Sequence, residues 1–235
     1  RIDIDPRADH PAPVCFDGAC RVEIISANYL ELRAADDAAS LSLGSSQWGD
    51  GALTMAGGTY QIGYNHINYP QVTIQDANIT FSQGSGSTFD YRYIQAEQLT
   101  IQNSTIQGVA NVYSVERHGE EYREKFADSS ITIQNSAITY AEEVTDSYYT
   151  GMLCNAETIT IEGSTITGAA STASIACIGG IFEMLTIRDS EVYIESDYIS
   201  SNNITTAPAI GPDRDAYRRY MSTLGITAPS IVIED

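Results

Sequence analysis

A nine-residue pattern of apolar and polar positions recurs along the chain. Its first, third and eighth positions are apolar or aromatic, its second is mostly Thr, and its sixth is always small. Five copies align without gaps, at Val72–Thr80, Leu99–Gln107, Ile131–Thr139, Ile159–Thr167 and Leu185–Tyr193. Weaker copies occupy Val22–Leu30 and Leu53–Gln61, and Ile231–Ile233 matches the start of an eighth copy. Self-similarity of this kind indicates a repeat architecture, in which each copy belongs to one coil.

Each copy is predicted to form two short strands around a tight corner. Apolar first and third positions around an outward Thr are typical of a β-strand. The fifth position is often Asn, Asp or Gly, residues that tolerate the left-handed backbone of a corner. A third strand is predicted before most copies, at Tyr60–Gly63, Tyr93–Ile94, Met152–Cys154, Ile175–Gly179 and Ala209–Gly211.

Three strands per coil predict an all-β fold, a right-handed parallel β-helix (solenoid) of about eight coils. At ~4.8 Å per coil such a stack is roughly 38 Å long. A leucine-rich repeat has a similar period, but the copies lack its Leu and Asn spacing and its helix.

The pattern also sets the expected domain organisation. Residues 1–21 form an N-terminal segment, in which Cys15 and Cys20 are spaced for a small disulfide loop. Residues 22–235 form a single domain with inserted loops at 109–130 and 195–230. The second insertion carries helix boundary signals over 212–225, which predict one short helix near the C-terminus. Cys154 and Cys177 lie in successive third strands, and the sequence leaves open whether they are bonded.

The copies Leu99–Gln107, Ile131–Thr139 and Ile159–Thr167, with the elements at Ile178–Gly180 and Ile210–Gly211, resemble secreted bacterial proteins of the pectate-lyase-like β-helix superfamily. Within it, they are most similar to non-catalytic polysaccharide-binding β-helix domains. The resemblance implies a secreted or cell-surface location in a bacterium and a carbohydrate ligand. Some of these domains bind calcium, so the resemblance also makes Ca²⁺ a candidate ligand; no other cofactor is expected.

The net charge of the chain argues against two classes of partner. The chain has 12 Lys and Arg against 31 Asp and Glu, a formal net charge of −19. This charge argues against nucleic acid or an anionic membrane surface as the main partner. No apolar run approaches the ~20 residues needed to cross a bilayer, so direct membrane insertion is not expected. Because the chain begins with Arg1, we expect a mature chain or an excised domain from which the signal segment is absent.

Aromatic residues give the clearest indication of a ligand. Tyrosines, Tyr69 among them, lie between the copies rather than at their inward positions, and Trp48 lies in a Gly- and Ser-rich stretch. Exposed aromatic faces stack on sugar rings, although the same residues could instead cover strand ends. The predicted ligand-binding residues are Tyr91, Tyr93, Tyr113, Tyr148, Tyr149 and Trp48.

Acidic residues supply weaker candidates. Glu142, Glu143 and Asp146 carry the oxygen ligands that Ca²⁺ prefers, and a solvated acidic surface is the competing interpretation. No catalytic residue is assigned. The outward Thr positions are explained by β-propensity.

These observations favour a non-catalytic extracellular binding or adhesion domain that recognises polysaccharide or host glycoconjugate through Tyr-rich inter-coil loops. One alternative is a β-helix polysaccharide lyase or glycoside hydrolase acting on acidic polysaccharide, with the acids of 113–125 or 142–149. Another is a structural stalk, or a surface that binds a host or cell-surface protein.

Overall fold

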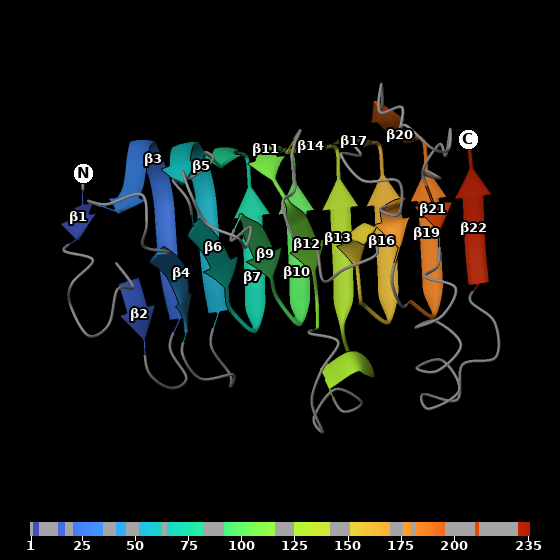
Figure 1. Cartoon of the computed structure of the whole chain (residues 1–235), viewed down its shortest axis with the longest axis horizontal. Helices are drawn as coiled ribbons and strands as arrows, with labels where there is room; N and C mark the ends of the chain where they lie inside the picture. The colour runs from blue at the N-terminus through green and yellow to red at the C-terminus, as the bar shows by residue number, and fades with distance from the viewer. Residues whose placement is uncertain are drawn as a thin grey trace, which may run out of the picture.

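Figure 1 shows a computed structural model of the chain, in which strands follow one another along the longest axis of the molecule. The structure describes residues 2–4, 14–16, 21–34, 41–45, 52–62, 65–81, 92–115, 125–141, 151–169, 176–179, 182–195, 210–211 and 230–235. The predicted helix at 212–225 and the residue Cys20 of the predicted disulfide lie outside these ranges.

The described strands form one 14-stranded and one 8-stranded sheet, and every strand pairing among the described residues is parallel. The first face of the larger sheet contains β7 (Gln71–Gln75), β10 (Gln98–Gln102), β13 (Ser130–Gln134), β16 (Thr158–Glu162), β19 (Met184–Arg188) and β22 (Ser230–Glu234). Its second face contains β8 (Asn78–Phe81), β11 (Thr105–Val109), β14 (Ala137–Tyr140), β17 (Thr165–Ala169) and β20 (Glu191–Glu195).

Two long strands join these faces, because β3 (Arg21–Ala34) and β5 (Ala52–Ile62) run through both. The short β1 (Ile2–Ile4) pairs with the end of β3. The 8-stranded sheet is the third face, and it contains β2 (Val14–Phe16), β4 (Leu41–Ser45), β6 (Asn65–Asn68), β9 (Tyr93–Gln95), β12 (Asn111–Tyr113), β15 (Gly151–Cys154), β18 (Ala176–Gly179) and β21 (Ile210–Gly211).

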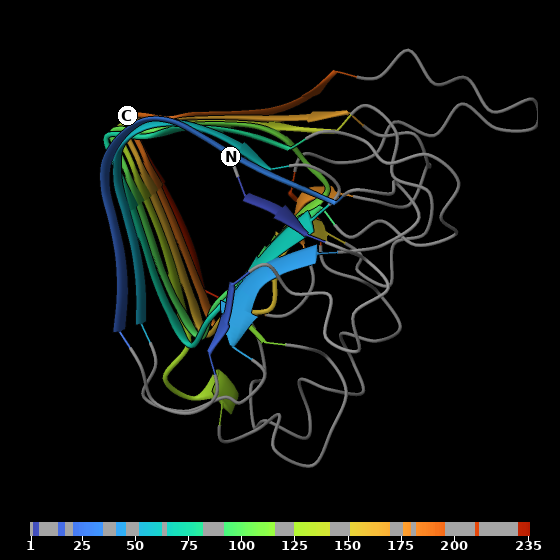
Figure 2. The same cartoon turned by 90° about the vertical axis from the view of Figure 1, so that its left-hand side faces the viewer.

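From β7 onward the chain visits the first, second and third faces in turn and then returns to the first, one strand further along. Seen along the long axis, the strands superpose into three walls around an interior (Figure 2). The prediction of an all-β fold with stacked parallel strands is therefore confirmed, and the arrangement is compatible with a parallel β-helix.

The interior is filled by rows of like residues that the strand register brings together. Ile74, Ile101, Ile133, Ile161 and Ile187 pair in sequence across the first face, and all five are buried in one hydrophobic cluster. The interior also holds large aromatic side chains, including those of Tyr60, Tyr69, Tyr140 and Phe182. Tyr69 was expected to lie outside the core, and that expectation is wrong.

The corners between the first and second faces have the geometry that the repeat predicts. Asp76, Asn103, Asn135, Gly163 and Asp189 all have positive φ, between 45° and 57°. Their short polar side chains, or the missing one of Gly163, tolerate this left-handed conformation.

The small residue that follows each corner forms a hydrogen-bonded column. The hydroxyl of Ser136 donates to the Gln134 carbonyl oxygen at 2.7 Å and accepts the Ser104 backbone N–H at 3.1 Å. The same pair of bonds recurs at Ser104, Ser164 and Ser190. The serines therefore tie each coil to the next at the corner, in addition to fitting its limited space.

Some elements differ from the predicted ones. Asn111–Tyr113, which the sequence placed in the inserted loop at 109–130, form strand β12. Lys125 and Phe126, in the same stretch, are helical. Tyr60–Ile62 belong to the second-face part of β5, and the third-face strand of that coil is β6.

The register also separates the two cysteines of the third face. Cys154 of β15 pairs with Gly179 of β18, and Leu153 pairs with Ile178. Cys177 therefore lies two register positions away from Cys154, so the two residues are not direct cross-strand neighbours.

Candidate functional site

The outer surface of the first face is a regular array of polar side chains, most of them uncharged. On β7, β10, β13 and β16 the second and fourth residues are buried, while the first, third and fifth are half-buried or exposed. We call these outward side chains the Thr–Gln face; they are Gln71, Thr73, Gln75, Gln98, Thr100, Gln102, Ser130, Thr132, Gln134, Thr158, Thr160 and Glu162.

Strand register aligns this face into straight files. The central file contains Thr54, Thr73, Thr100, Thr132, Thr160 and Thr186, each paired with the next. Gln75, Gln102 and Gln134 form a flanking file, and Gln71 pairs with Gln98 on the other side. Equivalent groups thus repeat at the spacing of neighbouring strands, ~4.8 Å.

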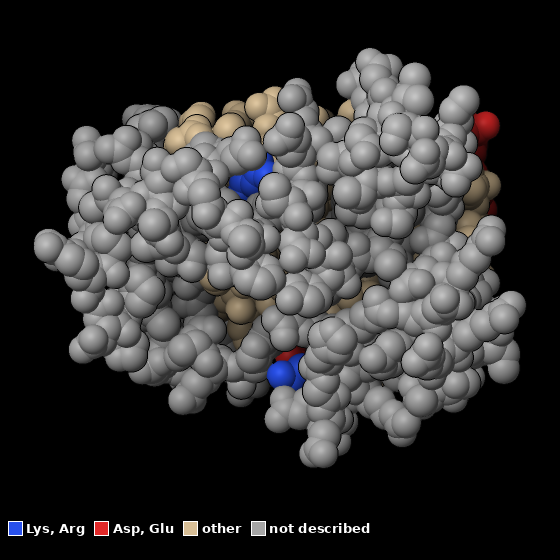
Figure 3. All heavy atoms as spheres, viewed as in Figure 1, with Lys and Arg blue, Asp and Glu red and all other residues tan. Residues whose placement is uncertain are grey.

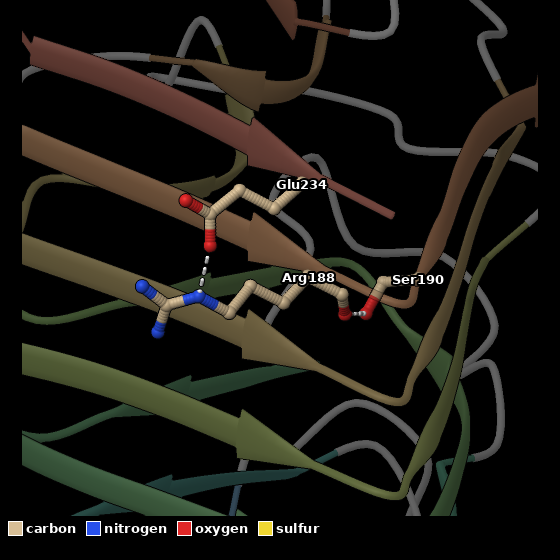
Figure 4. A network of polar contacts seen from close by, with 3 residues as sticks. All are labelled: Arg188, Ser190 and Glu234. Carbon is tan, nitrogen blue, oxygen red and sulfur yellow. Dashed lines mark hydrogen bonds and ion pairs between the residues drawn. The ribbon is translucent and has the colours of Figure 1, made fainter.

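Charge is absent from β7, β10 and β13, although the chain as a whole carries −19. The first charged residue of the flanking file is Glu162, which accepts a hydrogen bond from Gln134 Nε2 at 3.2 Å. Farther along the file, Arg188 Nε donates to Glu234 Oε2 at 2.6 Å (Figure 4). This hydrogen bond and the charge of Glu234 raise the pKa of Arg188.

Acidic atoms are visible at the end of the molecule that carries β22 (Figure 3). The charged part of the first face thus lies at the C-terminal end of the stack, and its neutral part lies on β7, β10 and β13.

A second cluster lies on the outward side of the third face. The ring of Tyr93 stacks on His66 at a centroid distance of 4.4 Å, and it contacts Tyr113 at 5.5 Å in a tilted arrangement. The Tyr113 hydroxyl donates to Gln95 Oε1 at 3.0 Å, and both side chains are buried. These three rings therefore pack on one another.

His66 belongs to the same cluster. Its Nδ1 atom is buried and makes no hydrogen bond. Burial lowers the pKa of His66 from 6.5 to about 4, because the imidazolium form would lose its hydration. The side chain is therefore neutral near pH 7.

Of the predicted ligand-binding residues, Tyr93 and Tyr113 are described, and the structure brings them together. Tyr91, Tyr148, Tyr149 and Trp48 lie outside the described residues, as do the calcium candidates Glu142, Glu143 and Asp146. The described part of the chain contains no group of three or more His, Cys, Asp or Glu residues arranged to hold a metal ion.

The Thr–Gln face is not among the sites predicted from the sequence. The signal was present, because Gln occurs at both ends of the strand segments Gln71–Gln75 and Gln98–Gln102. β-Propensity alone accounts for Thr at the second position. The strand register is needed to show that the flanking Gln residues form files beside it.

Comparisons with protein-family models, curated proteins and solved structures gave no match for this chain. Among the described residues, no helix is both long and apolar enough to cross a membrane.

Proposed function

We propose that this chain is a non-catalytic extracellular binding domain that holds a neutral polysaccharide against its Thr–Gln face. The observation that carries the proposal is the in-register array of Thr and Gln on β7, β10 and β13, three neighbouring strands without a charged residue. The resemblance to polysaccharide-binding β-helix domains agrees with this choice of ligand.

The chemistry of the face suits sugar hydroxyls. A hydroxyl group both donates and accepts hydrogen bonds, and so do the Thr hydroxyl and the Gln amide. Because the same groups recur on successive strands, a polymer can make several weak contacts at once, and their combined effect raises its affinity.

Charge favours a neutral polymer over an acidic one. A chain with 31 Asp and Glu residues repels polyuronates, whereas a neutral glycan on a neutral face experiences no electrostatic repulsion. The proposal thus differs from an enzyme on acidic polysaccharide, and the Tyr-rich segments that contain Tyr148 and Tyr149 remain predicted contributors to binding.

For the scaffold we propose a right-handed parallel β-helix of about eight coils. Eight strands follow one another along the larger sheet from β3 to β22 through the first face. Connections between parallel strands of one sheet are right-handed in roughly 98% of cases, which supports the proposed hand.

The test removes hydroxyls without changing the shape of the face. The triple variant Thr73→Val, Thr100→Val and Thr132→Val keeps β-branched side chains but loses three donors and acceptors. We expect its retention by neutral polysaccharides in affinity electrophoresis to fall at least fivefold, about 1 kcal/mol of lost hydrogen bonding.

The matched control is Thr80→Val, Thr139→Val and Thr167→Val, which changes one file of the second face in the same way. This control should bind like the parent. Equal losses in both variants, or stronger retention by polyuronates than by neutral polymers, would contradict the proposal. Release of reducing ends or unsaturated products would show an enzyme, and absence of any retention would favour the stalk.

A further inference from the structure

The uncharged part of the Thr–Gln face is bounded along the long axis. Four neighbouring strands, the first-face part of β5 followed by β7, β10 and β13, carry no charged residue, and their central residues are Thr54, Thr73, Thr100 and Thr132. On the strand before them, β3, Glu23 occupies the register position of this central file. On the strand after them, β16, the flanking file changes from Gln134 to Glu162. The neutral array is therefore four coils long.

Outward groups on this face are spaced differently in its two directions. Along one strand they are two residues apart, ~6.6 Å, and Gln alternates with Thr on β7 and β10. Across the strands, identical groups follow one another at ~4.8 Å. The strands β7, β10, β13 and β16 follow one another along the long axis (Figure 1). A polymer of identical units can therefore present each unit to the same groups only if it lies along this axis.

The spacing across the strands suits one class of sugar polymer. When the two bonds that leave a pyranose ring are both equatorial and lie on opposite sides of the ring, the chain is extended. Each sugar then advances the chain by a distance close to the spacing of neighbouring strands. An axial bond turns the chain instead, so successive rings of an α-1,4-linked glucan do not stay in line. The small mismatch of an extended chain accumulates over only four coils, and Gln side chains have the rotational freedom to follow it.

The last Gln of the flanking file differs from the two before it. Gln75 and Gln102 are each followed in the file by another Gln, whereas Gln134 is followed by Glu162. Gln134 Nε2 donates to Glu162 Oε2 at 3.2 Å. This hydrogen bond engages a donor of Gln134 with the β16 coil, so that donor is not available to a ligand above β13.

Glu162 also changes the chemistry of the face above β16. An ionised carboxylate accepts hydrogen bonds but donates none, whereas the Gln amide does both. Glu162 is half-buried, and a sugar that covered it would remove more of the water around its charge. Loss of that hydration opposes binding. Glu162 therefore ends the array of equivalent groups.

Resting on the proposed function, we infer that the ligand is a linear, extended glycan with equatorial linkages, which lies along the long axis with one sugar per coil. Glu162 is then a specificity-determining residue, because it limits the contact to four sugars. Each of these sugars lies over one Thr of the central file.

The length of the contact can be measured by calorimetric titration with glucose oligomers of two to six sugars joined by β-1,4 bonds. For the parent, we expect the association constant to rise about threefold with each sugar up to the fourth, since each adds one set of contacts. Beyond the fourth sugar it should change by less than about twofold. Oligomers of the same sugars joined by α-1,4 bonds are the matched ligands, and the tetramer should bind roughly tenfold more weakly than its β-linked isomer.

The variant Glu162→Gln continues the Gln file onto β16 and removes the charge. The rise should then continue to the fifth sugar, with a gain of about threefold over the fourth. Glu191→Gln is the matched control, because Glu191 is exposed on the second-face strand β20, away from this array. It removes the same charge and should keep the length profile of the parent. Circular dichroism matching the parent checks that both variants fold.

Several results overturn the inference while the proposed function stands. They are an association constant that levels at two sugars, equal binding of the α-linked and β-linked isomers, and an unchanged length limit in Glu162→Gln. An equal shift in Glu191→Gln would assign the limit to total charge rather than to Glu162, with the same consequence. If the variant Thr73→Val, Thr100→Val and Thr132→Val retains neutral polysaccharides like the parent, the proposed function itself fails.

Discussion

Each corner serine makes two hydrogen bonds with one hydroxyl group. The O–H group donates to the carbonyl oxygen two residues earlier, and the hydroxyl oxygen accepts a backbone N–H from the preceding coil, as Ser136 does with Gln134 and Ser104. Ser104, Ser136 and Ser164 are buried, so a backbone N–H without this acceptor would have no water to replace it.

The first prediction tests this column. Ser136→Ala leaves the Ser104 N–H buried without its acceptor, so we expect the free energy of unfolding to fall by about 1–3 kcal/mol in urea denaturation. Ser130→Ala, at a half-buried outward position on β13, is the control and should change it by less than about 0.5 kcal/mol. Equal effects of the two substitutions would contradict the proposed role of the hydroxyl.

The second prediction concerns His66. Its pKa is about 4 in the folded protein and near 6.5 when unfolded, so between these values the unfolded state binds more protons. Above pH 6.5 the free energy of unfolding therefore includes the full contribution of neutral His66. This contribution falls as the pH drops toward 4, by up to about 3 kcal/mol.

His66→Phe keeps a ring against Tyr93 but cannot titrate. We expect urea midpoints at pH 7 and pH 4.5 to differ less in this variant than in the parent. An identical pH dependence in the two proteins would show that folding does not lower the pKa of His66.

The conformation or burial of a residue can be predicted from the sequence when the contacts that determine it lie within one coil. The left-handed corners at Asn103 and Asn135 follow from residue type alone, and the structure confirms them. Tyr69 and Tyr113 lie outside the nine-residue pattern, and their burial depends on how neighbouring coils pack. The sequence could not show this, and it could not show that Tyr93 stacks on His66 and contacts Tyr113.

Strand β11 contains an irregularity that the nine-residue pattern does not predict. Its register against β14 shifts between Gln107 and Val109, so Gly108 forms a bulge with φ of 73°. A Cβ at this position would collide with the backbone carbonyl oxygen of Phe81 on the neighbouring strand. Both constraints require glycine there.

The third prediction follows from this bulge. Gly108→Ala must strain the backbone and displace β8, so we expect the free energy of unfolding to fall by about 2 kcal/mol or more. Gly163→Ala is an instructive comparison, because its Cβ would approach the movable side chain of Asn135 rather than backbone. Thermal denaturation should rank the two substitutions in this order, and a larger loss for Gly163→Ala would contradict the explanation.

The strands of the first and second faces could be predicted because each copy of the pattern contains both. Strand β12 has only three residues, Asn111–Tyr113, and precedes a stretch rich in charge. Its pairing with β9 and β15, rather than any local periodicity, defines it as a strand. Short strands of this kind can be identified only when the positions of the neighbouring coils are known.

For the whole molecule, the uneven distribution of charge matters more than its total. The neutral strands β7, β10 and β13 lie within a chain of net charge −19. Contact with an anionic polymer must overcome repulsion between like charges, whereas contact with a neutral glycan does not.

The fourth prediction tests whether the proposed glycan contact involves charge. Raising the ionic strength from 0.01 M to 0.15 M shortens the screening length from roughly 30 Å to about 8 Å, which weakens contacts between charged groups. Retention by neutral polysaccharide should change by less than twofold over this range. Affinity electrophoresis at both salt concentrations provides the comparison, and glycan binding that falls steeply with salt would show a charged contact.

The matching registers of successive coils also determine how the chain can change in length. Ser136 and Ser164 are 28 residues apart and occupy the same place in neighbouring coils. A deletion that joins Ser130 directly to Ile159 removes one such interval, yet it brings β10 against β16 with Thr opposite Thr and Ile opposite Ile. A gene for this protein could therefore lose or duplicate a whole coil in one event and still encode a continuous interior. A deletion that does not join equivalent positions of two coils would place polar residues in it.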